Sequence, residues 1–115
     1  MTSYKQGEVL LVPFPFTDLT QTKQRPAVVV SANWFNACRD DAVCVAITSQ
    51  VPSHLEPDQF EIPAQDLTGA GLLKPSIAKV GKIFAIHETI VVKKIGQLTP
   101  DTTKKLIRVL QAVLS

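Results

Sequence analysis

The residue best suited to bind an anion is Arg25, which stands directly before a proline and a short apolar run. The residue before a proline is pushed into extended backbone geometry. The run over residues 27–31 is short, β-branched and bounded by polar residues, which is typical of a buried strand. We therefore expect Arg25 at the mouth of a strand, where its planar guanidinium can bind phosphate or carboxylate oxygens in pairs. The alternative is a solvated or ion-paired surface arginine.

A second polar stretch follows another apolar run and offers hydroxyl and amide groups. Residues 42–48 read as a buried strand that ends at Thr48 and is followed by Ser49 and Gln50. The Thr48 hydroxyl can donate a hydrogen bond to an anionic oxygen. The alternative is a polar strand exit in which this hydroxyl only caps the backbone.

The composition indicates one globular domain that spans residues 1–115, since 45% of the residues are hydrophobic and 19% are charged. The net charge of +2 is spread unevenly. Residues 39–66 hold one basic and six acidic residues, whereas residues 67–115 hold eight basic and two acidic residues. A basic C-terminal half suits a polyanionic partner, and an ordinary solvated surface is the alternative.

Other classes of site and location are disfavoured by the sequence. No apolar stretch approaches the roughly 18 residues of a membrane span, and the first residues lack the apolar core of a secretory signal. We therefore expect a cytoplasmic protein without membrane contact. Cys38, Cys44, His54 and His87 have neither the spacing of metal ligands nor that of a disulfide framework, so we expect no metal and no cofactor.

The rest of the chain predicts about six short strands and one C-terminal helix. The expected strands are residues 8–12, 27–31, 42–48, 60–62, 76–86 and 89–95. Pro13 is expected to break the first strand because proline cannot donate to a ladder. A bulge is expected at Gly81, and residues 33–36 fit a turn or one helical turn capped by Ser31 or Asn33.

The C-terminal helix has a clear start signal, with Thr99 as the capping hydroxyl and Pro100 at the first helical position. Five apolar residues then recur at helical spacing and are expected to lie in the core. They are Leu106, Ile107, Leu110, Val113 and Leu114. The sum is a mainly β fold, a small and strongly bent or barrel-like sheet with a helix packed against it.

Five separate stretches fit one known family in their order and spacing. They are residues 7–17, 25–31, 45–49, 71–76 and 95–99. Together they resemble the MazF/PemK toxins of bacterial toxin–antitoxin systems. The resemblance implies an SH3-like barrel of the MazF/CcdB type, usually a homodimer. It also implies a metal-independent endoribonuclease that cuts single-stranded RNA at short sequences, and a cognate antitoxin whose flexible acidic segment blocks the RNA groove.

By position, the resemblance implies that Arg25 and Thr48 form the catalytic pair. RNA supplies its own nucleophile, the 2′-OH beside the scissile phosphate, so the enzyme must hold the two in line and stabilise the growing charge. We assign Arg25 to phosphate binding and transition-state stabilisation, because a guanidinium holds its proton too tightly to act as a base. The further RNA-binding candidates are Phe16, Thr17, Ser49, Gln50, Lys79 and Lys82.

One segment departs from the family's pattern. Many members carry an Asp-Gln pair followed by an Arg where this chain has Gly81, Lys82 and Phe84, which bears on the base preference. Two alternatives stay open. One is a non-catalytic barrel that binds a protein target, as the gyrase-inhibiting CcdB fold does, and the other is a degenerate toxin that binds only RNA or an antitoxin. A phosphate clamp favours the nuclease, because a protein-binding barrel has no need of one.

Overall fold

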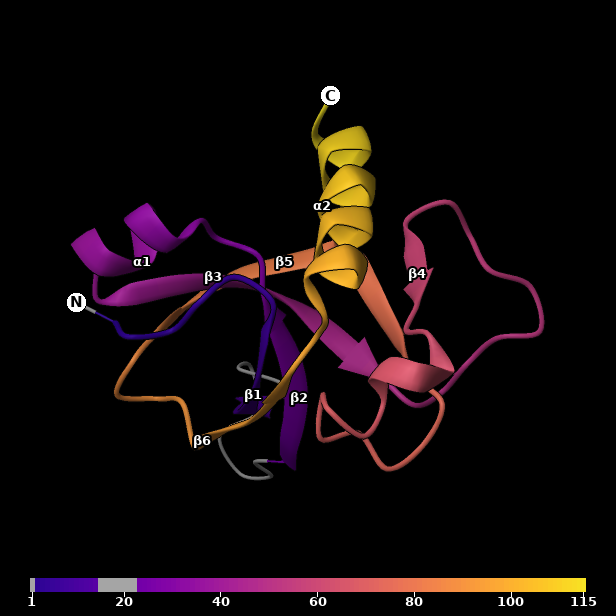
Figure 1. Ribbon diagram of the computed structural model, residues 1–115, viewed down its shortest axis with the longest axis horizontal. Coiled ribbons are helices and arrows are strands. Elements are labelled where there is room, and N and C mark those ends of the chain that lie inside the picture. Colours follow the sequence, from indigo (N-terminus) through magenta and orange to yellow (C-terminus); the bar gives the residue numbers. More distant parts are fainter. Residues whose placement is uncertain (1, 15–22) are drawn as a thin grey trace.

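The computed structural model describes residues 2–14 and 23–115, which form one six-stranded antiparallel sheet, two α-helices and a short 3₁₀ helix (Figure 1). The strands are β1 (Glu8–Phe14), β2 (Lys23–Val29), β3 (Asp41–Thr48), β4 (Gln59–Glu61), β5 (Ile77–His87) and β6 (Lys93–Gln97), in the spatial order β4-β5-β3-β2-β1-β6. The helices are α1 (Asn33–Cys38), the 3₁₀ helix η1 (Ala64–Asp66) and α2 (Pro100–Leu114). The predicted mainly β fold with a C-terminal helix is confirmed. Within the described ranges, no helix has the length and apolar character that a bilayer span requires.

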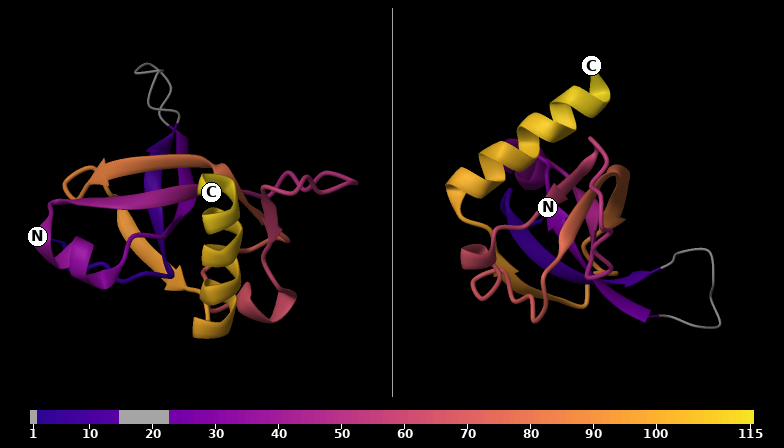
Figure 2. Two further views of the ribbon diagram at one scale, coloured as in Figure 1. Left: turned by 90° about the horizontal axis from the view of Figure 1, so that it is seen from above. Right: turned by 90° about the vertical axis from the view of Figure 1, so that its right-hand side faces the viewer.

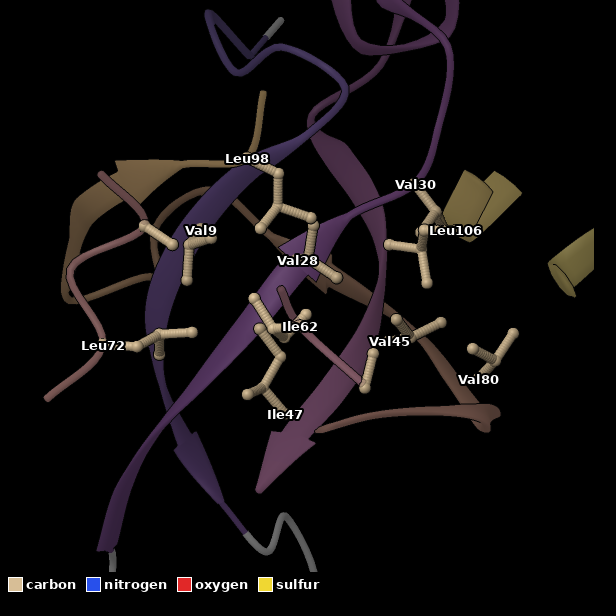
Figure 3. Packing of buried hydrophobic residues seen from close by; sticks show 12 residues of the cluster. Val9, Val28, Val30, Val45, Ile47, Ile62, Leu72, Val80, Leu98 and Leu106 are labelled. Atoms are coloured by element: carbon tan, nitrogen blue, oxygen red, sulfur yellow. The ribbon is translucent and has the colours of Figure 1, made fainter. Parts of the chain in front are cut away.

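Both faces of the curved sheet are apolar, which explains why its central strands are almost continuous hydrophobic runs. Successive side chains of a strand point to opposite faces. One set therefore packs with Leu106 of α2 in a first cluster, part of which Figure 3 shows. The alternate set forms a second cluster on the other face. That second cluster contains Leu10, Val12, Ala27, Val29, Ala42, Cys44 and Ile86.

The expectation that Pro13 breaks the first strand is wrong, because β1 continues through it. The reason lies in the neighbours of each strand. The pairing of β1 with β6 ends at Leu11, and the pairing of β2 with β3 starts only at Ala27. Pro13 and Pro26 therefore lie where their strands have a single neighbour, and a missing N–H is tolerated at such edge positions. Arg25 consequently lies inside β2 and not at its mouth.

The bulge predicted at Gly81 is confirmed by the pairing of β3 with β5. Val45 lies opposite Ile83, whereas the next residue, Ala46, lies opposite Lys79. Residues 80–82 therefore have no partner of their own on β3. An irregularity of this kind bends a strand, so the part of β5 before residue 80 and the part after residue 82 run in different directions.

Two boundaries differ from the prediction for local reasons. The last strand begins at Lys93 because residues 87–90 form a turn, in which the Ile90 N–H donates to the His87 carbonyl at 2.9 Å. Helix α1 is longer than one turn, and Ala32 precedes it without a side-chain cap. The expected cap at Ser31 or Asn33 is therefore wrong.

The start of α2 is as predicted, but the burial of its last turn is not. The Thr99 side chain accepts a hydrogen bond from the Thr102 N–H at 3.3 Å. Leu106 is buried, whereas Val113 and Leu114 are exposed. The C-terminal turns extend past the sheet, as the right-hand view of Figure 2 shows. These two residues are therefore not core residues, because helical spacing identifies an apolar face but not whether the sheet reaches it.

Candidate functional site

The register of the sheet brings Arg25 and Thr48 to the same place. Strands β2 and β3 are paired with Ala27 opposite Ala46. Successive side chains of a strand alternate between the two faces, so Arg25 and Thr48, each two residues past this last pair, project from the same face as the two alanines. The guanidinium of Arg25 is exposed, Thr48 is half-buried, and both line one open cleft.

This cleft, which we call the basic cleft, has a volume of about 210 Å³. Its position follows from the sizes of the side chains that pair across the sheet. Ala27 and Ala46 lie opposite each other and leave the surface hollow, while the larger Val12 and Phe84 stand around them. The described residues that line it are Val12, Arg25, Pro26, Ala27, Ala46, Ile47, Thr48, Gln50, Lys79, Lys82 and Phe84. Five of the predicted site residues are thus gathered on one face of the sheet.

The described charges of the basic cleft all have the same sign. Among residues 2–14 and 23–115, Arg25, Lys79 and Lys82 line it, and no Asp or Glu does. In the part of the chain that the structure describes, none of these three cations forms an ion pair. Three cations that share a concave surface without a carboxylate create a positive potential that attracts an anion.

A second hollow, of about 300 Å³, adjoins the basic cleft on the other side of the arginine–threonine pair. The two hollows share Arg25, Pro26, Ile47 and Thr48. Ser49 lies in the second hollow and not in the basic cleft. The remaining lining of the second hollow is Leu11, Gln24, Gly71, Leu72, Leu73, Lys74, Ser76 and Ile95.

The structure also shows the backbone cap that was the alternative role of Thr48. The Gln50 N–H donates to the Thr48 hydroxyl oxygen at 3.1 Å. This bond uses one acceptor site of the hydroxyl, and the hydroxyl can still donate its own proton to a ligand. The structural role and the ligand-binding role of Thr48 are therefore compatible.

Phe16 and Thr17 lie outside the described residues. Sequence reasoning missed the two alanines that form the floor of the cleft, because their pairing depends on a register that no local pattern reveals. It noted Phe84 only as a departure from the family, although its ring lines the cleft. Neither His54 nor His87 lines either hollow. Among residues 2–14 and 23–115, no three His, Cys, Asp or Glu side chains are grouped so as to hold a metal ion.

Comparison with protein families gives a match over nearly the whole chain. Residues 5–114 match the family described as "PemK-like, MazF-like toxin of type II toxin-antitoxin system". No curated protein matches the sequence.

Solved structures show the same fold at low sequence identity. An endoribonuclease in complex with its cognate antitoxin, from a mycobacterial species, has a TM-score of 0.76 and 21% identity, covering 97% of this chain and 95% of that chain. MazF from Deinococcus radiodurans has a TM-score of 0.72 and 17% identity, covering 96% of each chain. The Mycobacterium tuberculosis toxin MazF-mt6 has a TM-score of 0.72 and 15% identity, covering 93% of this chain and 95% of that chain.

Proposed function

Because this chain belongs to the PemK-like, MazF-like toxin family of type II toxin–antitoxin systems, we propose that it is an endoribonuclease that cuts single-stranded RNA without a metal ion. The observation that carries the proposal is the meeting of Arg25 and Thr48 in a cleft whose described lining holds two lysines and no carboxylate. The similar mycobacterial structure is an endoribonuclease, which agrees with this chemistry.

In the proposed reaction the substrate supplies the nucleophile. The 2′-oxygen of one ribose attacks the adjacent phosphorus, the bond from phosphorus to the 5′-oxygen breaks, and the products are a 2′,3′-cyclic phosphate and a 5′-hydroxyl. The 2′-OH loses a proton and the 5′-oxygen gains one. The protein's task is to hold these atoms in line and to stabilise the charge on the non-bridging oxygens.

The two residues of the pair divide this task. The Arg25 guanidinium provides two parallel N–H donors for the non-bridging oxygens. Thr48 donates its hydroxyl proton to the same phosphate. Lys79 and Lys82 stand farther along the basic cleft and are suited to the phosphates of neighbouring nucleotides, which determine affinity more than rate.

We further propose two protein partners for this chain. One is a cognate antitoxin with an acidic segment that competes with RNA for the basic cleft. The family is that of type II toxin–antitoxin systems, and the three cations of the cleft would attract acidic side chains. The other is a second copy of the chain. The exposed Val113 and Leu114 at the end of α2 provide apolar surface that self-association would remove from water.

The test is a cleavage assay in EDTA with a mixed-sequence RNA and a DNA of the same sequence. We expect only the RNA to be cut, with cyclic phosphate ends, because DNA lacks the 2′-OH. Arg25→Ala should slow cleavage by about 10²–10³ or more and leave the circular dichroism spectrum unchanged. Arg39→Ala is the matched control, since Arg39 is exposed and its side chain bonds only the adjacent Cys38 carbonyl.

Each remaining outcome of this assay points to a different function. Cleavage by Arg25→Ala at the wild-type rate would contradict the site. RNA binding without cleavage would indicate a degenerate toxin, and neither binding nor cleavage would indicate a barrel that acts on a protein target. DNA cleavage would rule out attack by the 2′-OH.

A further inference from the structure

Leu73 is 99% exposed, although the segment that carries it is held firmly in place. Leu72, the preceding residue, is buried in the first cluster (Figure 3). Gly71 has φ +74°, and a Cβ at this glycine would lie 2.2 Å from the Ile95 carbonyl oxygen, so the backbone is pressed against β6. On the other side, the Ser76 hydroxyl donates to the Lys74 carbonyl at 2.8 Å. The fold therefore fixes an apolar side chain in water at a defined position.

This position is the rim of the second hollow, which touches the arginine–threonine pair. Pro26, Ile47 and Leu72 give the hollow apolar surface. Gln24, Ser49 and Ser76 add polar groups, and Lys74 adds a cation. No Asp or Glu is among the described residues that line this hollow. A flat ligand with apolar faces and polar edges fits such a lining, and single-stranded RNA presents its bases in this form.

The two hollows give the line along which an RNA strand bound at Arg25 and Thr48 would run. A phosphate that is bound by Arg25 and Thr48 has the basic cleft on one side and the second hollow on the other. The nucleotides that flank this phosphate therefore enter different hollows. The volume of about 300 Å³ lies at the lower end of the range for small-ligand pockets, which suits one nucleotide.

We propose that the second hollow binds the base of a nucleotide next to the scissile phosphate, and that Leu73 packs against the face of that base. This inference rests on the proposed function and deepens it, because it assigns a base-binding residue to one side of the cut. Leu73 takes no part in the bond changes. Its loss weakens binding of the RNA and leaves the chemistry at phosphorus intact.

The test measures binding of a short RNA that spans a mapped cleavage site and carries a 2′-deoxynucleotide at the scissile position. This substitution removes the nucleophile, so affinity is measured without cleavage. We expect Leu73→Ala to weaken binding about fivefold in fluorescence anisotropy. Ile90→Ala is the matched control, since Ile90 is 48% exposed in the turn after β5 and lines neither hollow, and it should bind as the wild type does.

Abasic nucleotides placed one at a time along the same RNA identify the contacted base. At one position beside the scissile phosphate, loss of the base should weaken wild-type binding about fivefold and cause no further loss in Leu73→Ala. Two results would overturn the subsite: wild-type affinity in Leu73→Ala, or, at every abasic position, a binding loss that adds to the loss caused by Leu73→Ala. Leu73 would then contact a protein partner or only solvent. A wild-type protein that binds no RNA would instead overturn the proposed function and the subsite together.

Discussion

The Gln50 backbone amide donates a hydrogen bond to the Thr48 hydroxyl oxygen at 3.1 Å. The backbone just after β3 therefore holds this oxygen in place, and in the proposed reaction the proton of the same hydroxyl is donated to the RNA phosphate. Thr48→Val keeps the shape of the side chain and removes the hydroxyl. We expect RNA cleavage to fall by about 10²–10³, because a donor to the phosphate is lost.

The same substitution should change the free energy of unfolding by only about 1 kcal/mol, since Gln50 is exposed and its amide can bond to water. Thr48→Ser retains the hydroxyl and should retain most of the activity. Single-turnover cleavage and thermal melting of the two variants separate the chemical role from the structural one. A Thr48→Val protein with normal cleavage would restrict this hydroxyl to capping the backbone.

The lysines of the basic cleft should affect the salt dependence of RNA binding. Lys79→Gln and Lys82→Gln each remove one cation, and we expect each to reduce the slope of log affinity against log salt concentration by about 0.7. KM for a short RNA should rise while kcat changes little. Lys104→Gln on α2 is the control, because Lys104 is exposed and lines neither hollow. An unchanged slope in both cleft variants would place the RNA elsewhere.

The depth of the basic cleft depends on the small side chain of Ala46, which is half-buried and lies opposite Lys79. Ala46→Leu should fill the cleft and weaken RNA binding by about tenfold or more, because the added methylenes occupy the space of the ligand. They enter an open hollow and not the packed core, so the cost in stability should stay below about 1.5 kcal/mol. Ala85→Leu, at an exposed position of β5, is the control, and equal RNA affinity in both variants would contradict the location of the site.

Cys44 makes the stability sensitive to alkaline pH. Burial raises the pKa of its thiol from 9.0 to about 12, because a thiolate is poorly solvated in the second cluster. Well below pH 9 the thiol is protonated in both states and has no effect. Between about pH 9 and 12 only the unfolded state loses the proton, so the free energy of unfolding falls by up to about 1.4 kcal/mol per pH unit.

Urea unfolding of the wild type and of Cys44→Ala at pH 8, 9.5 and 10.5 measures this effect. The wild type should lose stability relative to the variant as pH rises, whereas parallel curves would refute the shift. In the folded protein a thiol reagent should label the exposed Cys38, and it should reach Cys44 only after unfolding.

The sequence predicted best where a local signal had a single physical cause. The apolar run over residues 42–48 gave β3 to within one residue, and Thr99 with Pro100 gave the start of α2. Gly81 gave the bulge, since a glycine inside a strand pattern has few other uses. The local pattern indicates Arg25 and Thr48 as candidate ligand-binding residues and the family resemblance implies that they act as a pair, whereas only the strand register explains why they lie close together.

The errors concern features that depend on neighbours which a local pattern does not contain. Pro13 is compatible with a strand because β6 has already ended beside it. Val113 and Leu114 are exposed because the sheet ends before the helix does. The hollow above Ala27 and Ala46 exists only because these two residues pair, and the second hollow needs the segment around Leu73 to fold against β6.

Residues 23–26 of β2 are paired with β1 alone. Thr48, by contrast, still has Ile77 of β5 opposite it. Arg25 therefore belongs to a two-stranded ribbon, which twists more readily than a wide sheet. The twist of this ribbon sets the gap between the Arg25 guanidinium and the Thr48 hydroxyl, and Val12, which pairs with Arg25, ties the ribbon to the second cluster. In the proposed reaction the two donors to the phosphate therefore come from different parts of the sheet, Thr48 from its three-stranded part and Arg25 from the narrow ribbon.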